Sequence, residues 1–429
     1  MLERLLKFVL PAAVLLEPLP ALAYLDPGTG SMLLSVVVGV VSSAYFFARR
    51  LPEMTRALFF RMAGKKDAMQ ATGIVFYSER ASYWSTFAPV LRALDAMGEP
   101  VTFLTSDEAD PAFSCGLENV HARYVGKGQS AYTALGFVKA EVFALTTPGI
   151  DVLQIRRSAG VKKYVHIVHA VGDIHTYKLF SFDYYDAFFC AGPDQAESLR
   201  TLEASRGTRP KDLPVLGCPY LDELVSRQKA DARGPEPQTV LVAPTWGKNS
   251  LLSRLGARAV LELEEAGLRV ILRPHPQSFV SDETVMKEVL EAIEGHPGIE
   301  LDRRPDGFES MRRACVMVSD ISGIMFDFAF VFLRPVVSLG DGPLKDGFEA
   351  WEIPHPAWEE GILDAIGKRI PVGDEASLVA TVRELLEGRG AAGSDIERIR
   401  NAHVANFGEA GPAIARALVA QKREVKKDA

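Results

Sequence analysis

From residue 74 onward, short apolar runs alternate with longer segments whose apolar residues recur at helical spacing. Residues 74–77 and 101–104 are such short runs, and the segment between them carries apolar side chains at positions 84, 87, 90, 91 and 94. Short continuous apolar runs are typical of buried strands, and the three-to-four spacing is typical of an amphipathic helix. The pattern therefore predicts a strand, a crossover helix and a second parallel strand.

The same alternation continues along the chain. Further strands are expected at 122–125, 142–146, 164–169, 187–190, 239–243, 269–272, 316–319 and 335–339, with helices between them. A polar segment with Gly234, Pro235 and Pro237, at 227–238, divides the series and has the composition of a linker. We predict an α/β protein with two Rossmann-like, doubly wound domains facing a cleft, at 67–230 and 231–395. Residues 396–429 are expected to form a bracing helix and a tail.

The first 66 residues have a different pattern. Residues 31–48 carry no charged side chain, and this is long enough to cross a hydrocarbon core of ~30 Å. Cations follow directly, at Arg49, Arg50, Arg56, Arg61, Lys65 and Lys66. An excess of Lys and Arg beside a span marks its cytoplasmic side. We therefore expect an N-terminal membrane anchor with a basic collar, and catalytic domains on the cytoplasmic side of the inner membrane.

A second apolar stretch precedes that predicted span. It follows Arg4 and Lys7 and ends in Ala21-Leu22-Ala23, which is the pattern of a secretory signal. The stretch is either cleaved or forms the first half of a helical hairpin, and both alternatives leave residues 50 onward inside. The turn-rich residues 24–30 would then lie outside, as a structural loop or as a contact for a partner.

Charge and cysteine content narrow the class of protein. The 429 residues include 48 Lys and Arg against 55 Asp and Glu, a net charge of −7, which argues against a polycation that coats nucleic acid. The four cysteines have neither a CxxC pair nor zinc-site spacing, which fits a reducing compartment. Residues 126–131 loosely match a dinucleotide loop but lack its acidic partner, and no P-loop motif is present, so we expect no cofactor.

Polar residues cluster where strands of the second predicted domain end. Arg273-Pro274-His275-Pro276 follows the run at 269–272, and its prolines cannot continue sheet pairing, so His275 is expected at a strand tip. Hydrogen-bond donors of this kind suit a phosphate or a diphosphate. Thr245 and Trp246 follow the run at 239–243, where they offer a hydroxyl and a flat face for a base or a sugar. Rim packing is the alternative role for Trp246.

A second phosphate-type site is expected where residues 319–328 leave a strand and open an apolar helix. Ser322 can cap that helix, and Gly323 lets the first helical amides approach an anion, which the helix dipole also favours. Asp320 and Asp327 belong to the same run.

In the first predicted domain, His169 ends a strand and faces the expected cleft. It is a candidate general base because the pKa of histidine lies near working pH. A merely buried histidine is the alternative, and Asp173, Lys178 and Asp183 could orient the ring or the acceptor. His166 and His169 point to opposite faces of a strand, which argues against a shared metal ion.

Together, His169, the linker, Ala243-Pro244-Thr245-Trp246, Arg273-Pro274-His275-Pro276 and the run at 319–328 resemble the CDP-glycerol:polyglycerophosphate glycerophosphotransferase family. These are the teichoic-acid polymerases and primases. The resemblance covers roughly residues 74–420, and it implies a GT-B fold and metal-independent transfer from a CDP-activated polyol phosphate. It also implies that His169 is the base and that His275 contacts the diphosphate as a second catalytic residue. The donor-binding residues that we predict are Thr245, Trp246, Arg273, Asp320, Ser322, Gly323 and Asp327.

The resemblance implies transfer of glycerol phosphate to an envelope polymer or a lipid-linked acceptor. The sequence departs from the family at residues 169–173 and at Gly323, where the family usually has a second serine. A Ser-Gly pair at a phosphate-binding helix also suits GT-B glycosyltransferases that use CMP- or UDP-sugars, so that function remains the alternative. The third alternative is an inactive, membrane-anchored protein that organises envelope assembly.

Overall fold

The computed structural model describes residues 73–231, 233–304, 306–320, 322–340, 345–388 and 393–427. The predicted signal-like segment, membrane span and basic collar lie outside these residues. Within the described ranges, no helix is both long and apolar enough to cross a membrane.

The first sheet consists of six parallel strands in the order β3-β2-β1-β4-β5-β6. Its strands are β1 (Ile74–Ser78), β2 (Val101–Thr105), β3 (Val120–Tyr124), β4 (Ala140–Leu145), β5 (Val161–Ile167) and β6 (Ala187–Phe189). The chain winds outward from β1 to β3 and then crosses back to wind outward in the other direction from β4. This is the doubly wound arrangement that the alternating pattern predicts.

The second sheet repeats this arrangement in the order β12-β11-β10-β7-β8-β9, also with parallel pairs. Its strands are β7 (Thr239–Val242), β8 (Arg269–Leu272), β9 (Ile299–Leu301), β10 (Val316–Ser319), β11 (Val336–Leu339) and β12 (Gly367–Ile370). The sequence pattern predicts neither β9 nor β12. Both are edge strands, and part of their surface is exposed, so they lack the apolar run of a central strand.

Helices cover both sheets. They are α3 (Trp84–Ala96), α4 (Gln129–Leu135), α5 (Pro193–Arg206), α6 (Pro219–Ala230), α7 (Leu251–Leu255), α8 (Arg258–Glu265), α9 (Ser278–Ser281), α10 (Glu283–Ala292), α11 (Phe308–Arg313), α12 (Ile324–Phe332), α13 (Trp358–Ile362), α14 (Leu378–Leu386), α15 (Gly393–His403) and α16 (Ala410–Lys427). Residues 227–230, expected to be linker, form the last turn of α6. Cations such as Arg227 and Lys229 are favourable there because they face the negative end of the helix dipole.

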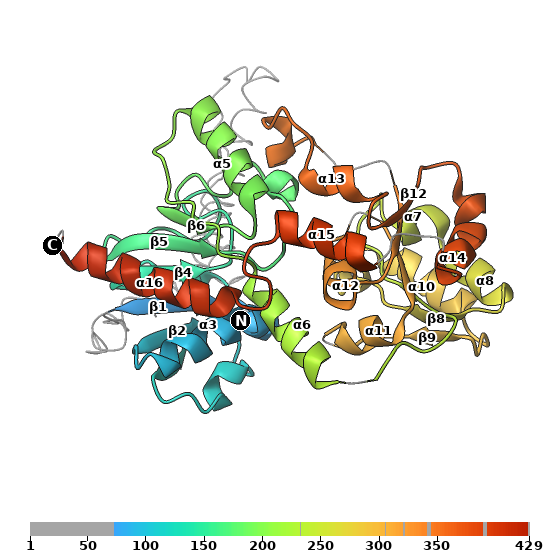
Figure 1. Ribbon diagram of the computed structural model, residues 1–429. Coiled ribbons are helices and arrows are strands. Elements are labelled where there is room, and N and C mark those ends of the chain that lie inside the picture. The colour runs from blue at the N-terminus through green and yellow to red at the C-terminus, as the bar shows by residue number, and fades with distance from the viewer. Residues whose placement is uncertain are drawn as a thin grey trace, which may run out of the picture. The chain divides into compact units, whose positions relative to one another are not determined.

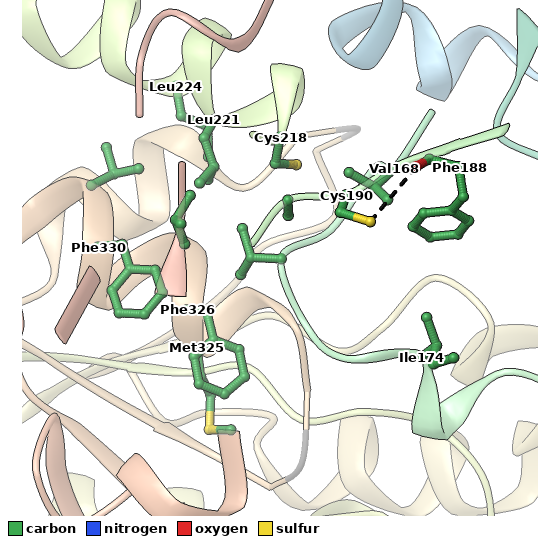
Figure 2. Packing of buried hydrophobic residues seen from close by; sticks show 14 of the residues in the cluster. Val168, Ile174, Phe188, Cys190, Cys218, Leu221, Leu224, Met325, Phe326 and Phe330 are labelled. Carbon is green, nitrogen blue, oxygen red and sulfur yellow. Dashed lines mark hydrogen bonds between the residues drawn. The ribbon is translucent and has the colours of Figure 1, made fainter. Parts of the chain in front are cut away.

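One apolar core extends through both sheets. Figure 2 shows Leu221 and Leu224 of α6 together with Met325, Phe326 and Phe330 of α12, and all five side chains belong to one buried cluster. The same cluster contains Phe188 of β6 and Met317 of β10, one strand from each sheet. The two sheets are therefore joined by continuous apolar packing as well as by the connecting segment.

Polar contacts also join the two halves, through the segment between β11 and β12. The carboxylate of Glu359 accepts the backbone N–H of Asp173, at 3.1 Å to each oxygen. Arg206 of α5 donates to Asp183 at 2.6 Å and to Glu352 at 2.7 Å, and also pairs with buried Glu349. Since these groups are largely buried, removal of one partner would leave an uncompensated charge.

The C-terminal helix α16 lies along α3 of the first domain (Figure 1). The backbone N–H groups of Ala410 and Gly411 donate to the Asp222 carboxylate of α6, at 3.1 and 2.6 Å. Gly411 meets Pro89 of α3 so closely that an added Cβ would lie 2.7 Å from a backbone carbon. Helix α16 therefore packs on the first domain.

Replacing Gly411 with alanine should therefore destabilise the protein. The clash is with backbone atoms, which cannot move aside cheaply, and overpacking of this kind costs about 1–3 kcal/mol. Gly361→Ala in α13 is the matched control, because an added Cβ there meets nothing within 4 Å. Urea unfolding of the purified full-length protein should show a lower free energy of unfolding for Gly411→Ala only. Equal values for the two variants would contradict the described packing of α16 on α3.

Candidate functional site

The loops that carry the predicted donor-binding residues follow three adjacent strands. In the order β10-β7-β8, the loop after β7 carries Thr245 and Trp246, and the loop after β8 carries Arg273 and His275. The loop after β10 leads to Ser322 and Gly323. Because the strands are parallel, their carboxyl ends lie at one edge of the sheet, which is where open α/β sheets bind ligands.

Asp320 ties two of these loops together. It is only 3% exposed, and its carboxylate accepts the backbone N–H groups of Thr245 at 2.7 Å and Leu251 at 2.8 Å. Burial raises the pKa of Asp320, and the two amide hydrogen bonds oppose that rise. With both oxygens engaged, Asp320 holds the backbone from Thr245 to Leu251 in place, so its effect on a ligand would pass through that loop.

Trp246 and His275 form the exposed part of the site. The Trp246 side chain is 48% exposed, and its ring centroid lies 6.4 Å from that of His275. The Nδ1 atom of His275 accepts the backbone N–H of Gln277 at 3.1 Å. In the neutral ring the proton must then be on Nε2, which becomes a hydrogen-bond donor. Burial, with the nearby charge of Arg273, lowers the pKa of His275 and favours that neutral form.

Arg273 lies deeper and is already partnered. Its side chain is 11% exposed and pairs with Asp302 at 2.8 Å, while it also donates to the backbone carbonyl of Arg304 at 3.0 Å. Asp302 follows β9 and also accepts from Ser310 of α11. The guanidinium therefore joins the ends of β8 and β9 to α11, and part of its charge is compensated within the protein.

The N-terminus of α12 differs from the sequence prediction in its cap. The predicted cap is Ser322, but Gly323 is the N-cap residue and no side chain caps the helix. The backbone carbonyl of Ser322 instead accepts the N–H of Met325 at 3.1 Å, so the helix begins one residue later than predicted. Gly323 is exposed, and an added Cβ there would meet nothing within 4 Å. The first amides of α12 thus remain without a side-chain acceptor, next to open space.

Asp327 lies in the first turn of α12 and is 9% exposed. Burial raises its pKa to about 7. Its charge raises the pKa of Tyr220, in addition to the larger effect of burial, so the two groups are close although they come from different domains. The sequence analysis missed Tyr220. Its only signal is its position in the first turn of a helix, directly after Cys218-Pro219.

His169 lies two residues beyond the end of β5 and is half-buried. Its Nδ1 atom lies 2.7 Å from the hydroxyl oxygen of Thr146, the residue after β4. The rings of Tyr83 and Tyr177 meet its edge, with centroids at 5.4 and 6.5 Å. Burial lowers the pKa of His169 to about 4, so the ring is neutral at physiological pH.

The residues predicted to orient His169 have other partners. Asp173 accepts from Ser198 at 3.0 Å, Asp183 pairs with Arg206, and the backbone of Lys178 pairs with that of Phe348. The orienting group is Thr146, which the sequence analysis missed although it ends the predicted strand at 142–146. Sequence separation hid the contact, because β4 and β5 become neighbours only in the sheet.

His166 makes no hydrogen bond to His169 or Thr146. It is fully buried and stacks on Phe188 with ring centroids 4.7 Å apart, and neither ring nitrogen has a hydrogen-bond partner among the described residues. Across the same residues, no group of three or more His, Cys, Asp or Glu side chains could hold a metal ion.

Comparison with solved structures identifies the fold. Two structures of the wall teichoic acid polymerase TagF match with TM-scores of 0.53 and 0.54 at 11% and 12% identity, covering 88% of this chain and 98% of TagF. The UDP-GlcNAc 2-epimerase of Methanocaldococcus jannaschii matches with a TM-score of 0.54 at 14% identity, covering 81% of this chain and 99% of the epimerase. The structural resemblance to the teichoic-acid polymerases and the predicted GT-B fold are thereby confirmed.

Other solved neighbours hold uridine nucleotides. MnaA of Staphylococcus aureus, solved with UDP, has a TM-score of 0.54 and 14% identity, and covers 83% of this chain and 97% of its own. No family model matches the sequence. No curated protein matches it either.

The raised pKa of Asp327 makes stability depend on pH. As pH rises from the ordinary carboxyl value of 3.8 to about 7, the unfolded chain releases this proton before the folded protein does. Stability is therefore lost over this window, by up to ~4 kcal/mol, and the loss persists above pH 7. Asp327→Asn, which cannot ionise, should remove this component.

The test compares the free energy of unfolding at pH 5 and pH 8. We expect Asp327→Asn to gain stability relative to the wild type as pH rises. Asp346→Asn is the control because that carboxyl is exposed. Parallel pH profiles for Asp327→Asn and the wild type would show that Asp327 is not buried as described.

Proposed function

We propose that this protein is a GT-B transferase that moves glycerol phosphate, or a similar polyol phosphate, from a CDP-activated donor. The acceptor is an envelope polymer or a lipid-linked precursor. The observation that carries the proposal is the meeting of three loops, with Trp246, His275 and the uncapped N-terminus of α12, at one edge of the second sheet. These groups suit a nucleotide diphosphate because they combine a flat aromatic face with hydrogen-bond donors.

In the proposed reaction, an acceptor hydroxyl oxygen forms a bond to the donor phosphorus that carries the polyol, and the hydroxyl proton passes to a phosphate oxygen of the departing CMP. The phosphoanhydride bond to CMP breaks, and CMP leaves with the bridging oxygen. The Nε2–H of His275 and the positive end of the α12 dipole stabilise negative charge on the phosphates as it develops. Asp320 and Arg273 keep the loops in position. His169 belongs to the first domain, and there it interacts with the acceptor.

The cellular location is part of the proposal. Residues 31–48 anchor the chain in the inner membrane, and the cations at 49–66 keep the two domains on its cytoplasmic face. A lipid-linked acceptor would be held at that membrane surface, and the nucleotide donor would come from the cytoplasm.

A second candidate is a GT-B glycosyltransferase that uses a CMP- or UDP-sugar. The observation that favours it is the open space at Gly323, which leaves the phosphate-binding helix without a residue selective for one donor class. Several solved neighbours also bind uridine nucleotides, as in the M. jannaschii epimerase complex with UDP-GlcNAc and UDP. In this case the attacked atom is an anomeric carbon and the whole nucleoside diphosphate, or CMP, is the leaving group.

A donor screen separates these functions. The purified full-length protein is incubated with CDP-glycerol, CDP-ribitol, CMP-sugars and UDP-sugars, with bacterial membranes as the source of acceptor. We expect CMP release from a CDP-polyol, and a decrease of roughly 10²–10³-fold for His275→Ala because a donor to the phosphate is lost. UDP release would favour the glycosyltransferase. Conversion of UDP-GlcNAc without an acceptor would indicate an epimerase, and no turnover or nucleotide binding would indicate a scaffold.

Nucleotide binding should depend on Trp246. Loss of a base-stacking ring costs about 1–3 kcal/mol, or roughly 5- to 150-fold in Kd. Calorimetry with CDP should therefore show weaker binding by Trp246→Ala. Trp351→Ala is the matched control, because Trp351 is 66% exposed but does not lie on any of the three loops. Equal affinities for both variants would show that Trp246 does not contact the nucleotide.

A further inference from the structure

The contact between Thr146 and His169 determines which ring nitrogen of His169 carries the proton. The two atoms, Thr146 Oγ1 and His169 Nδ1, lie 2.7 Å apart. Either one could donate in isolation, since a hydroxyl both donates and accepts and a neutral imidazole has one nitrogen of each kind. The surroundings of Thr146 decide between the two arrangements.

Thr146 is 1% exposed, so water does not reach its hydroxyl group. Among the residues that the structure describes, His169 Nδ1 is the only hydrogen-bond partner of that hydroxyl. If Nδ1 carried the proton, the hydroxyl hydrogen of Thr146 would be buried without an acceptor, which proteins strongly avoid. The hydroxyl hydrogen therefore points to Nδ1, and Thr146 is the donor.

The other ring nitrogen, Nε2, then carries the proton. It has no hydrogen-bond partner within the described part of the chain, and it keeps contact with solvent. Tyr83 and Tyr177 contact the ring edgewise and limit its rotation. His275 in the second domain has the same tautomer for an independent reason, because the backbone N–H of Gln277 occupies its Nδ1.

We propose that Thr146 is a positioning residue that holds His169 as the Nε2–H tautomer, so that His169 donates a hydrogen bond to an anionic oxygen. This differs from the general-base role predicted from the sequence, which requires a free lone pair on Nε2. The ligand atom is a phosphate oxygen of the donor or of the acceptor. This catalytic use rests on the proposed transferase function, whereas the tautomer rests only on the contact with Thr146.

The tautomer can be measured directly and without turnover. Untagged full-length protein with ¹⁵N-labelled histidine is placed in detergent micelles, and long-range ¹⁵N–¹H correlation spectra are recorded at neutral pH. Comparison with His169→Gln assigns the His169 signals among the eight histidines. We expect the Nε2–H pattern in the wild type and in Thr146→Ser. Thr146→Val, which has the same shape but no hydroxyl, should show a mixture of tautomers.

An Nδ1–H pattern for His169 in the wild type would overturn the proposal. So would a Thr146→Val spectrum identical to that of the wild type, because the hydroxyl would then have no influence on the ring. Unchanged signals from the remaining histidines show that the variant is folded. If Thr146→Val does not fold, the wild-type and Thr146→Ser spectra still decide the tautomer.

Kinetics then test the use of this tautomer in transfer. With the donor identified by the screen, we expect Thr146→Val to lower kcat at least 10-fold with little change in KM, and Thr146→Ser to retain most of the activity. Equal kcat values for the two variants would show that Thr146 does not position His169 for transfer. An absence of transfer in the wild type would count against the proposed function alone, since the spectra test the tautomer separately.

Discussion

The burial of α12 is the constraint on which the rest of the structure depends. Every residue from Met325 to Phe332 is buried, so this helix has no solvent face. It packs on β10 and β11 of the second domain, and it also contacts α6 and α15. Any shift of α12 would expose apolar surface on several sides at once. Because Asp327 in its first turn is buried, the packing that joins the domains also positions the N-terminus of α12, where the phosphate-type site is predicted.

Most charged groups around the site form hydrogen bonds or ion pairs within the protein. The carboxylate of Asp320 accepts two backbone amides, one on each oxygen, and Arg273 is paired with Asp302. Two neutral features remain at the site within the described residues: the Nε2–H of His275, which has no protein acceptor there, and the N-terminus of α12, which no side chain caps. Preorganised neutral donors stabilise developing charge without the cost of breaking an ion pair. In this site, charged side chains hold the loops in place, and neutral hydrogen-bond donors remain available to a ligand.

Much of the fold could be predicted from the pattern of the chain because central strands are buried on both faces. The runs at 269–272 and 316–319 coincide with β8 and β10. The edge strands β9 and β12 escaped prediction because half-exposed strands such as 367–370 contain Lys368 and Arg369 beside few apolar residues. The end of α6 was missed for a related reason, since a polar last turn resembles a linker when only composition is considered. Residues 1–72 lie outside the described structure, so the predicted anchor remains a prediction.

Local sequence by itself determined that Thr245, Trp246, Arg273 and His275 leave strands of the second domain, because strand ends follow from short-range patterns. Only the tertiary structure decided what these residues do there. It placed Asp320 under the Thr245 loop, gave Arg273 a partner in Asp302, and brought Tyr220 beside Asp327. It also set Thr146 against His169, which are 23 residues apart in sequence but lie just beyond the ends of the adjacent parallel strands β4 and β5. The physical reason is that protonation, pairing and burial depend on neighbours in space, and chain folding chooses those neighbours.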